Sequence, residues 1–100
     1  MTQVFVALGS NLAQPMAQIE AAYRALKALP QTDWVASSSL YRTAPVGYAN
    51  QPDFINAVVE LDTQLAPHAL LTALQHIEYT QGRARTFANA PRTLDLDLLW

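Results

Sequence analysis

The sequence contains no cysteine and few charged residues, and both shortages narrow the functions to consider. Without cysteine the chain can form no disulfide, and it has no thiolate to bind zinc or to act as a nucleophile. Charged residues make up 14% of the chain and leave a net charge of −2, which argues against broad affinity for nucleic acids or anionic membranes. No apolar run approaches the roughly 18 residues of a membrane-spanning helix, and no basic segment typical of a signal peptide opens the chain. We therefore expect a cytoplasmic protein with no nucleic-acid or membrane partner.

The residues that are present indicate one globular domain with a small basic cluster. A hydrophobic fraction of 51% over 100 residues suits a single domain that buries somewhat over about 60% of its unfolded surface. Three of the six basic residues, Arg83, Arg85 and Arg92, lie within ten positions. This cluster could simply keep the surface soluble, or it could bind phosphate oxygens, because guanidinium groups offer paired donors.

Hydrophobic periodicity predicts four strands and two helices. The strand-like segments are 4–8, 34–43, 54–61 and 93–99. Pro15 and Pro67 each open a segment with helical spacing, and these helices should end before Pro30 and at Gly82. The order β-α-β-β-α-β predicts an α+β, ferredoxin-like domain over residues 1–100, with an antiparallel sheet of order 4-1-3-2 and both helices on one face.

This topology brings three loops to one end of the sheet. They are the loop after the first strand, the loop 44–52 and the loop 82–91. Loops longer than a simple connection requires are often functional. We expect the segment from Gly82 to Ala90 to be mobile without ligand, because few of its side chains can be buried.

The last strand alternates leucine with Asp95 and Asp97. Period 2 places both carboxylates on one face, roughly 6.6 Å apart along the strand. Aspartate is unfavourable in strands, and neighbouring like charges repel each other. The pair can be interpreted as a solvated acidic edge or as two carboxylates held for a divalent cation, and the spacing leaves both interpretations open.

Two further groups of residues could serve a ligand at this end. Phe54 and Asn56 should share the face of the aspartates, and an aromatic plane beside a carboxamide suits a flat, hydrogen-bonding heterocycle. Packing of Phe54 on its own loop and capping of a turn by Asn56 would also explain these two residues. On the second helix, Leu71, Gln75 and Glu78 form one stripe that could reach a ligand or could be a solvated flank.

Five motifs carry a resemblance to a known family along the whole chain. They are GSN after the first strand, LYRTAPVG, QPDFINAV, IE-x-x-QGR and PRTLDLDLL. Together they resemble the 6-hydroxymethyl-7,8-dihydropterin pyrophosphokinases of folate biosynthesis, and PRTLDLD is highly specific. The resemblance implies a ferredoxin-like transferase that moves the β,γ-pyrophosphoryl group of ATP onto the pterin hydroxymethyl oxygen and releases AMP. It also implies small-molecule substrates and a chain that lacks the family's C-terminal third, and we expect a monomer.

The resemblance assigns roles to individual residues. It implies two Mg²⁺ ions held by Asp95 and Asp97, and it adds the three arginines of the basic cluster to these two as catalytic residues. The implied pterin-binding residues are Thr43, Val46, Phe54 and Asn56. The implied ATP-binding residues are Leu71, Gln75, Glu78, Arg83, Arg85, Arg92 and Leu98. Two positions depart from the family pattern: Asn89 stands where a tryptophan is usual, and His76 where some relatives have an arginine.

A non-catalytic, ferredoxin-like module that binds small molecules is the main alternative. An RNA-binding domain of this fold would need the motif K/R-G-F/Y-G/A-F and a basic sheet face, and the sequence has neither. A sensor domain would not need paired strand aspartates beside an arginine cluster. Binding of Mg-ATP, as opposed to binding of an amino acid, would separate the enzyme from the sensor.

Overall fold

The computed structural model describes most of the 100-residue chain. The described residues are 1–11, 14–45, 47, 50–81 and 94–99. The predictions for Val46, Asn89, the three arginines of the basic cluster and the mobility of the segment 82–90 lie outside these residues. Neither of the two described helices is long and apolar enough to cross a membrane.

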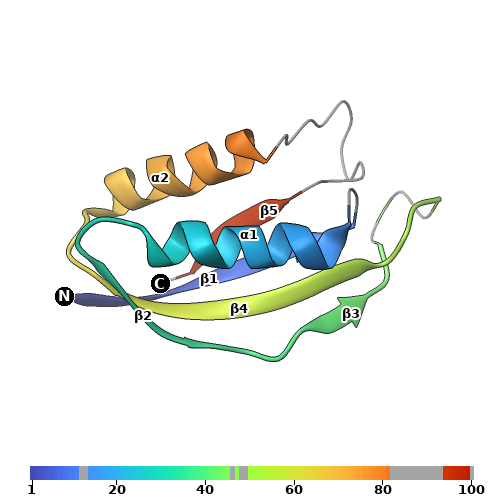
Figure 1. Cartoon of the computed structure of the whole chain (residues 1–100), viewed down its shortest axis with the longest axis horizontal. Coiled ribbons are helices and arrows are strands. Elements are labelled where there is room, and N and C mark those ends of the chain that lie inside the picture. Colours follow the sequence, from blue (N-terminus) through green and yellow to red (C-terminus); the bar gives the residue numbers. More distant parts are fainter. Residues whose placement is uncertain (12–13, 46, 48–49, 82–93, 100) are drawn as a thin grey trace.

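Within the described residues, one open antiparallel sheet carries two helices on one face (Figure 1). The strands are β1 (Thr2–Ser10), β2 (Thr32–Ser37), β3 (Tyr41–Thr43), β4 (Phe54–Thr63) and β5 (Asp95–Leu99). The helices are α1 (Pro15–Lys27) and α2 (Pro67–Thr80). The sheet order is β2-β4-β1-β5, and β3 also pairs with β4. The predicted ferredoxin-like fold and its strand order are confirmed.

The predicted second strand is two strands in the structure. β2 and β3 both pair with β4, and the register of β2 shifts between Trp34 and Ala36. In the gap, the Ser38 amide donates to the Val58 carbonyl over 2.8 Å, while the Ser38 hydroxyl oxygen accepts from the Val58 amide over 2.9 Å. Because a serine side chain can replace a backbone group in such pairing, the regular ladder stops here and resumes at β3.

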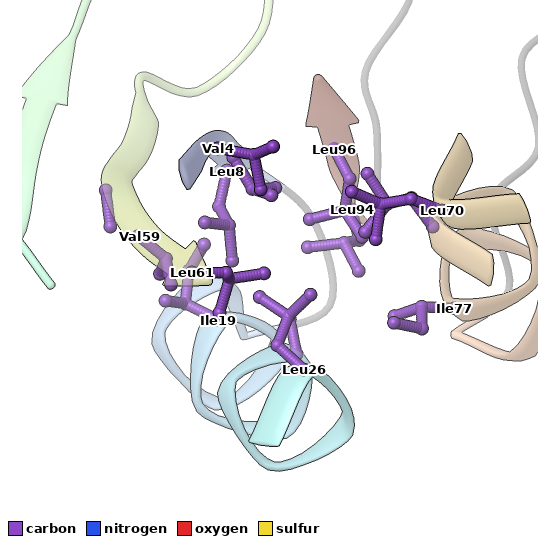
Figure 2. Packing of buried hydrophobic residues seen from close by; sticks show 14 residues of the cluster. Val4, Leu8, Ile19, Leu26, Val59, Leu61, Leu70, Ile77, Leu94 and Leu96 are labelled. Atoms are coloured by element: carbon purple, nitrogen blue, oxygen red, sulfur yellow. The ribbon is translucent and has the colours of Figure 1, made fainter. Parts of the chain in front are cut away.

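The hydrophobic core lies between the helices and one face of the sheet (Figure 2). Along β4, Ala57, Val59 and Leu61 are fully buried, while the residues between them are partly exposed. Burying one such valine or leucine side chain stabilises the fold by about 1.5 to 3 kcal/mol. The alternation therefore shows which face of β4 the helices cover.

The core also determines the register of β5. Leu94 and Leu96 are buried with Leu70 and Ile77 of α2 in the same cluster (Figure 2). A shift of one residue would turn every side chain of the strand to the opposite face. Such a shift would bury two aspartates among leucines, so the packing of α2 strongly disfavours it.

Candidate active site

Asp95 and Asp97, called the acidic pair below, lie on the face of the sheet opposite the helices. This face is called the open face. Leu96 is buried on the helix-covered face, whereas Asp95 is partly exposed and Asp97 is exposed. Successive side chains of a strand point to opposite faces, so both carboxylates point to the open face, as the alternation in the sequence predicts.

Strand pairing aligns the acidic pair with the predicted pterin residues. Asp95 pairs with Gly9, Gly9 pairs with Asn56, and Asn56 pairs with Tyr41. Neighbouring strands are about 4.8 Å apart, so Asp95 and Asn56, two strands apart, are separated by roughly 10 Å between their backbones. Asp97 occupies the next row, opposite Ala7. These rows lie at the end of the sheet where β1 ends and where β4 and β5 begin (Figure 1).

The carboxamide of Asn56 is oriented by its neighbours. Its Nδ2 donates to the hydroxyl oxygen of Thr43 over 2.8 Å and lies 3.4 Å and 3.3 Å from the carbonyl oxygens of Tyr41 and Phe54. This network assigns the nitrogen to the protein side and turns Oδ1 toward Gly9. Since the Thr43 oxygen accepts from Asn56, its hydroxyl hydrogen can point elsewhere. Asn56 and Thr43 together can therefore offer one acceptor, Oδ1, and one donor, the hydroxyl, to the edge of a heterocycle.

Gly9 leaves space between the acidic pair and Asn56. A Cβ atom at this position would lie 3.3 Å from Oδ1 of Asn56 and 3.7 Å from Cδ1 of Phe54. The first distance is tighter than ordinary van der Waals contact, so a side chain here would press on the carboxamide. Because it has no side chain, Gly9 leaves the sheet surface flat beside the Phe54 ring. Gly9 belongs to the GSN motif, but the sequence alone does not mark it as a site residue.

Asn11, also in the GSN motif, forms hydrogen bonds to the loop that leads into β4. The residue is 2% exposed, and its Nδ2 donates to Oε1 of Gln51 over 2.8 Å and to the carbonyl oxygen of Pro52 over 3.0 Å. These bonds join the end of β1 to the residues just before Phe54. This role cannot be seen in the sequence, because the two partners are 40 and 41 positions away.

Of the residues predicted for ATP, the structure describes three on α2 and Leu98 on β5 itself. Leu71 and Gln75 are exposed on α2, and Leu98 is partly buried against the core. Glu78 is 8% exposed, and its Oε2 accepts a hydrogen bond from the Leu96 amide over 2.7 Å. The predicted pterin residues and the predicted ATP contacts on α2 therefore lie on opposite sides of β5. A ligand that touches both groups must pass around this strand.

The acidic pair suits a cation that is shared with a substrate. Among the residues that the structure describes, no cluster of three or more His, Cys, Asp or Glu side chains could enclose a metal ion. Mg²⁺ prefers oxygen ligands and is commonly held by one or two carboxylates together with waters and substrate phosphates. Asp95 and Asp97, two carboxylates on one face of a rigid strand, fit that kind of site.

A hollow of about 260 Å³ lies farther along the same face. It is lined by Phe5, Ala36, Ser37, Ser38, Val58 and Glu60. Val58 pairs with Ala7, opposite Asp97, and Glu60 pairs with Phe5 one row farther from Asn56. The predicted site residues therefore lie beside this hollow and not inside it.

Comparison with known proteins gives a family match over nearly the whole chain. A family model described as 7,8-dihydro-6-hydroxymethylpterin-pyrophosphokinase (HPPK) matches residues 5–100. The chain is 58% identical over 97 residues to the 2-amino-4-hydroxy-6-hydroxymethyldihydropteridine pyrophosphokinase of Pseudomonas aeruginosa, and the match covers 97% of this chain and 60% of that protein. It is 46% identical over 99 residues to the protein of the same name from Haemophilus influenzae, covering 99% of this chain and 62% of the relative.

A plant relative shows the same match within a larger protein. The chain is 38% identical over 98 residues to the mitochondrial folate synthesis bifunctional protein of Pisum sativum, which covers 98% of this chain and 19% of that protein. The chain thus spans about three-fifths of the length of the two bacterial relatives above. The match over residues 5–100 and these identities show that the chain belongs to the 7,8-dihydro-6-hydroxymethylpterin-pyrophosphokinase family.

Proposed function

We propose that this chain carries the catalytic core of a pyrophosphokinase that transfers pyrophosphate from ATP to 6-hydroxymethyl-7,8-dihydropterin. The observation that carries the proposal is the row from Asp95 through Gly9 to Asn56, which aligns acidic oxygens with a heterocycle-binding carboxamide. The family match and the names of the relatives support the same activity.

The pterin ring binds at the Asn56 end of this row. Oδ1 of Asn56 accepts a ring N–H, the Thr43 hydroxyl donates to a ring acceptor, and Phe54 provides an aromatic surface. Val46, outside the described residues, completes the pterin set that the motifs predict. Because the strand register fixes these groups relative to Asp95, the hydroxymethyl arm of the pterin extends toward the acidic pair.

The phosphates of ATP bind at the other end of the row. Asp95 and Asp97 would hold two Mg²⁺ ions, which when bound offset the negative charge of the phosphates during transfer. Arg83, Arg85 and Arg92 remain predicted donors to phosphate oxygens. Leu71, Gln75, Glu78 and Leu98 are the further ATP contacts predicted from the motifs.

Transfer requires the two substrates to approach in line. The pterin hydroxymethyl oxygen forms a bond to the β-phosphorus of ATP, the bond from that phosphorus to the bridging oxygen of AMP breaks, and the hydroxyl proton is released. The protein contributes mainly position and electrostatic stabilisation to such a reaction. The pterin residues lie on the open face, whereas the predicted ATP contacts on α2 lie across β5, so the two substrates reach Asp95 and Asp97 from different directions.

The test is an assay of AMP release by the natural gene product. ATP, Mg²⁺ and the pterin are supplied together, the pterin is omitted in the blank, and Asp97→Asn serves as the inactive control. We expect pterin-dependent AMP release by the unmodified protein alone. Calorimetric binding of both ligands without AMP release would instead favour a non-catalytic binding module. We also propose a monomer, which the elution volume in size-exclusion chromatography checks.

A further inference from the structure

Glu78 makes a hydrogen bond that bears directly on the acidic pair. The residue is 8% exposed, and its carboxylate Oε2 accepts from the Leu96 amide over 2.7 Å. Leu96 is the residue between Asp95 and Asp97. Carboxylates are rarely this buried unless they are paired or hydrogen-bonded, so the contact belongs to the folded structure and is not a chance surface contact.

The direction of this bond follows from the geometry of the strand. Amides of successive residues point to opposite edges of a strand, so the Leu96 amide points toward α2 while those of Asp95 and Asp97 point toward β1. β5 lies at one edge of the sheet that the described residues form. The backbone around the pair is thus held from both edges, by β1 on one side and by Glu78 on the other.

We propose that Glu78 is a positioning residue that fixes the backbone between Asp95 and Asp97 and thereby places their carboxylates for a divalent cation. The inference rests on the proposed function only in that it takes the pair to bind Mg²⁺. It goes beyond that function, because the motif resemblance implies only an ATP contact for Glu78.

Leucine packing alone does not supply this precision. Leu94 and Leu96 pack on α2 through apolar contacts, which are not directional. A charge-assisted hydrogen bond is directional and roughly twice as strong as a neutral one. Since a functional site works only when its groups are held within about 0.5 Å, the directional contact determines where the two carboxylates lie.

The test compares two variants of Glu78 by a measurement that needs no activity. Hydrogen exchange of the Leu96 amide is followed by NMR in the metal-free natural gene product. We expect Glu78→Ala to speed this exchange by about tenfold or more, because the amide loses a charged acceptor. Glu78→Gln keeps an acceptor oxygen and should restore most of the protection. Glu20→Gln, at an exposed carboxylate of α1, controls for the loss of charge.

Cation binding provides the second measurement. The Mg²⁺ concentration for half-maximal AMP release should rise about fivefold or more in Glu78→Ala and less than about twofold in Glu78→Gln, while pterin affinity stays unchanged. Unchanged Leu96 exchange in Glu78→Ala would overturn the proposal. Equal loss of Mg²⁺ dependence in both variants would also overturn it, because the charge and not the position would then matter. If Glu78→Ala does not fold, Glu78→Asp, whose shorter side chain should leave the amide unprotected, takes its place.

The two proposals fail in different ways. If Asp97→Asn changes neither Mg²⁺ binding nor AMP release, the assignment of the acidic pair in the proposed function is wrong. If Asp97→Asn abolishes Mg²⁺ binding while Glu78→Ala leaves it intact, the proposed function stands and the positioning role of Glu78 is wrong.

Discussion

The two faces of this sheet differ in burial and in polar content although the same strands form them. On β4, Val59 and Leu61 are fully buried under the helices, while Asn56, Val58 and Glu60 remain partly exposed on the open face. Because side chains alternate along a strand, burial of one set fixes the direction of the other. The covered face therefore determines the register, and the open face can carry polar groups that would be unfavourable in a core.

The largest expected effect comes from removing charge on the open face. Asp97→Asn keeps the shape of the side chain but removes one negative charge from a site that should hold two Mg²⁺ ions. We expect turnover to fall by at least about 100-fold, as when one preorganised electrostatic group is lost. Steady-state rates at saturating Mg²⁺ measure this. The melting temperature in EDTA should be unchanged or slightly higher, because one of two repelling charges is removed. Near-normal turnover would support the simple acidic-edge interpretation.

Adjacent valines on β4 test the difference between the faces directly. Val59→Ala removes buried methyl groups from the core and should lower the free energy of unfolding by about 2 kcal/mol. Val58→Ala removes the same atoms from the open face and should cost less than about 1 kcal/mol. Urea denaturation of the two variants compares them. Equal losses of stability would mean that the open face contributes to stability as much as the covered one.

Space on the open face is tested at Gly9. Gly9→Ala places a Cβ atom 3.3 Å from Oδ1 of Asn56, which forces the carboxamide to move by a few tenths of an ångström. We expect pterin to bind about tenfold more weakly, a typical cost of overpacking, whereas the melting temperature should change little because alanine also restricts the unfolded chain. Calorimetric titration measures the affinity. Ala7→Ser, two positions earlier on the same face, is the control and should leave pterin binding unchanged.

The smallest effect concerns the attachment of the loop before β4. Asn11→Ala removes two hydrogen bonds, to Gln51 and Pro52, and should lower the free energy of unfolding by about 1 kcal/mol. Asn50→Ala changes an exposed carboxamide in the same loop and should have no measurable effect. Thermal melting of both variants provides the comparison, and a larger loss at Asn50 would contradict it.

The sequence was sufficient to predict the features that depend on local periodicity. The alternation of Leu94 and Leu96 with the two aspartates predicted which face of β5 would be polar, because burial on a strand repeats every second residue. The prolines at 15 and 67 likewise marked the first residues of both helices. The strand order followed from the sequence of elements and the handedness of their connections.

Features that depend on remote partners could not be predicted in this way. The strand at 34–43 is interrupted because Ser38 bonds to Val58, twenty positions away. The helix stripe with Glu78 was compatible with a ligand or with solvent, and only the position of β5 reveals that this carboxylate is buried. The role of Gly9 depends on the positions of Asn56 and Phe54, which lie on the neighbouring strand β4.

The hydrogen bond from the Leu96 amide to Glu78 also bears on association with other copies of the chain. An edge strand presents unpaired amides and carbonyls that can recruit a strand from another chain, which is a common route to aggregation. On β5, the central amide is already bound to a buried carboxylate. A second strand would have to displace this hydrogen bond, and breaking a bond to a buried carboxylate carries an energetic cost. Within the sheet that the described residues form, Glu78 thus makes this edge a poor template for strand addition.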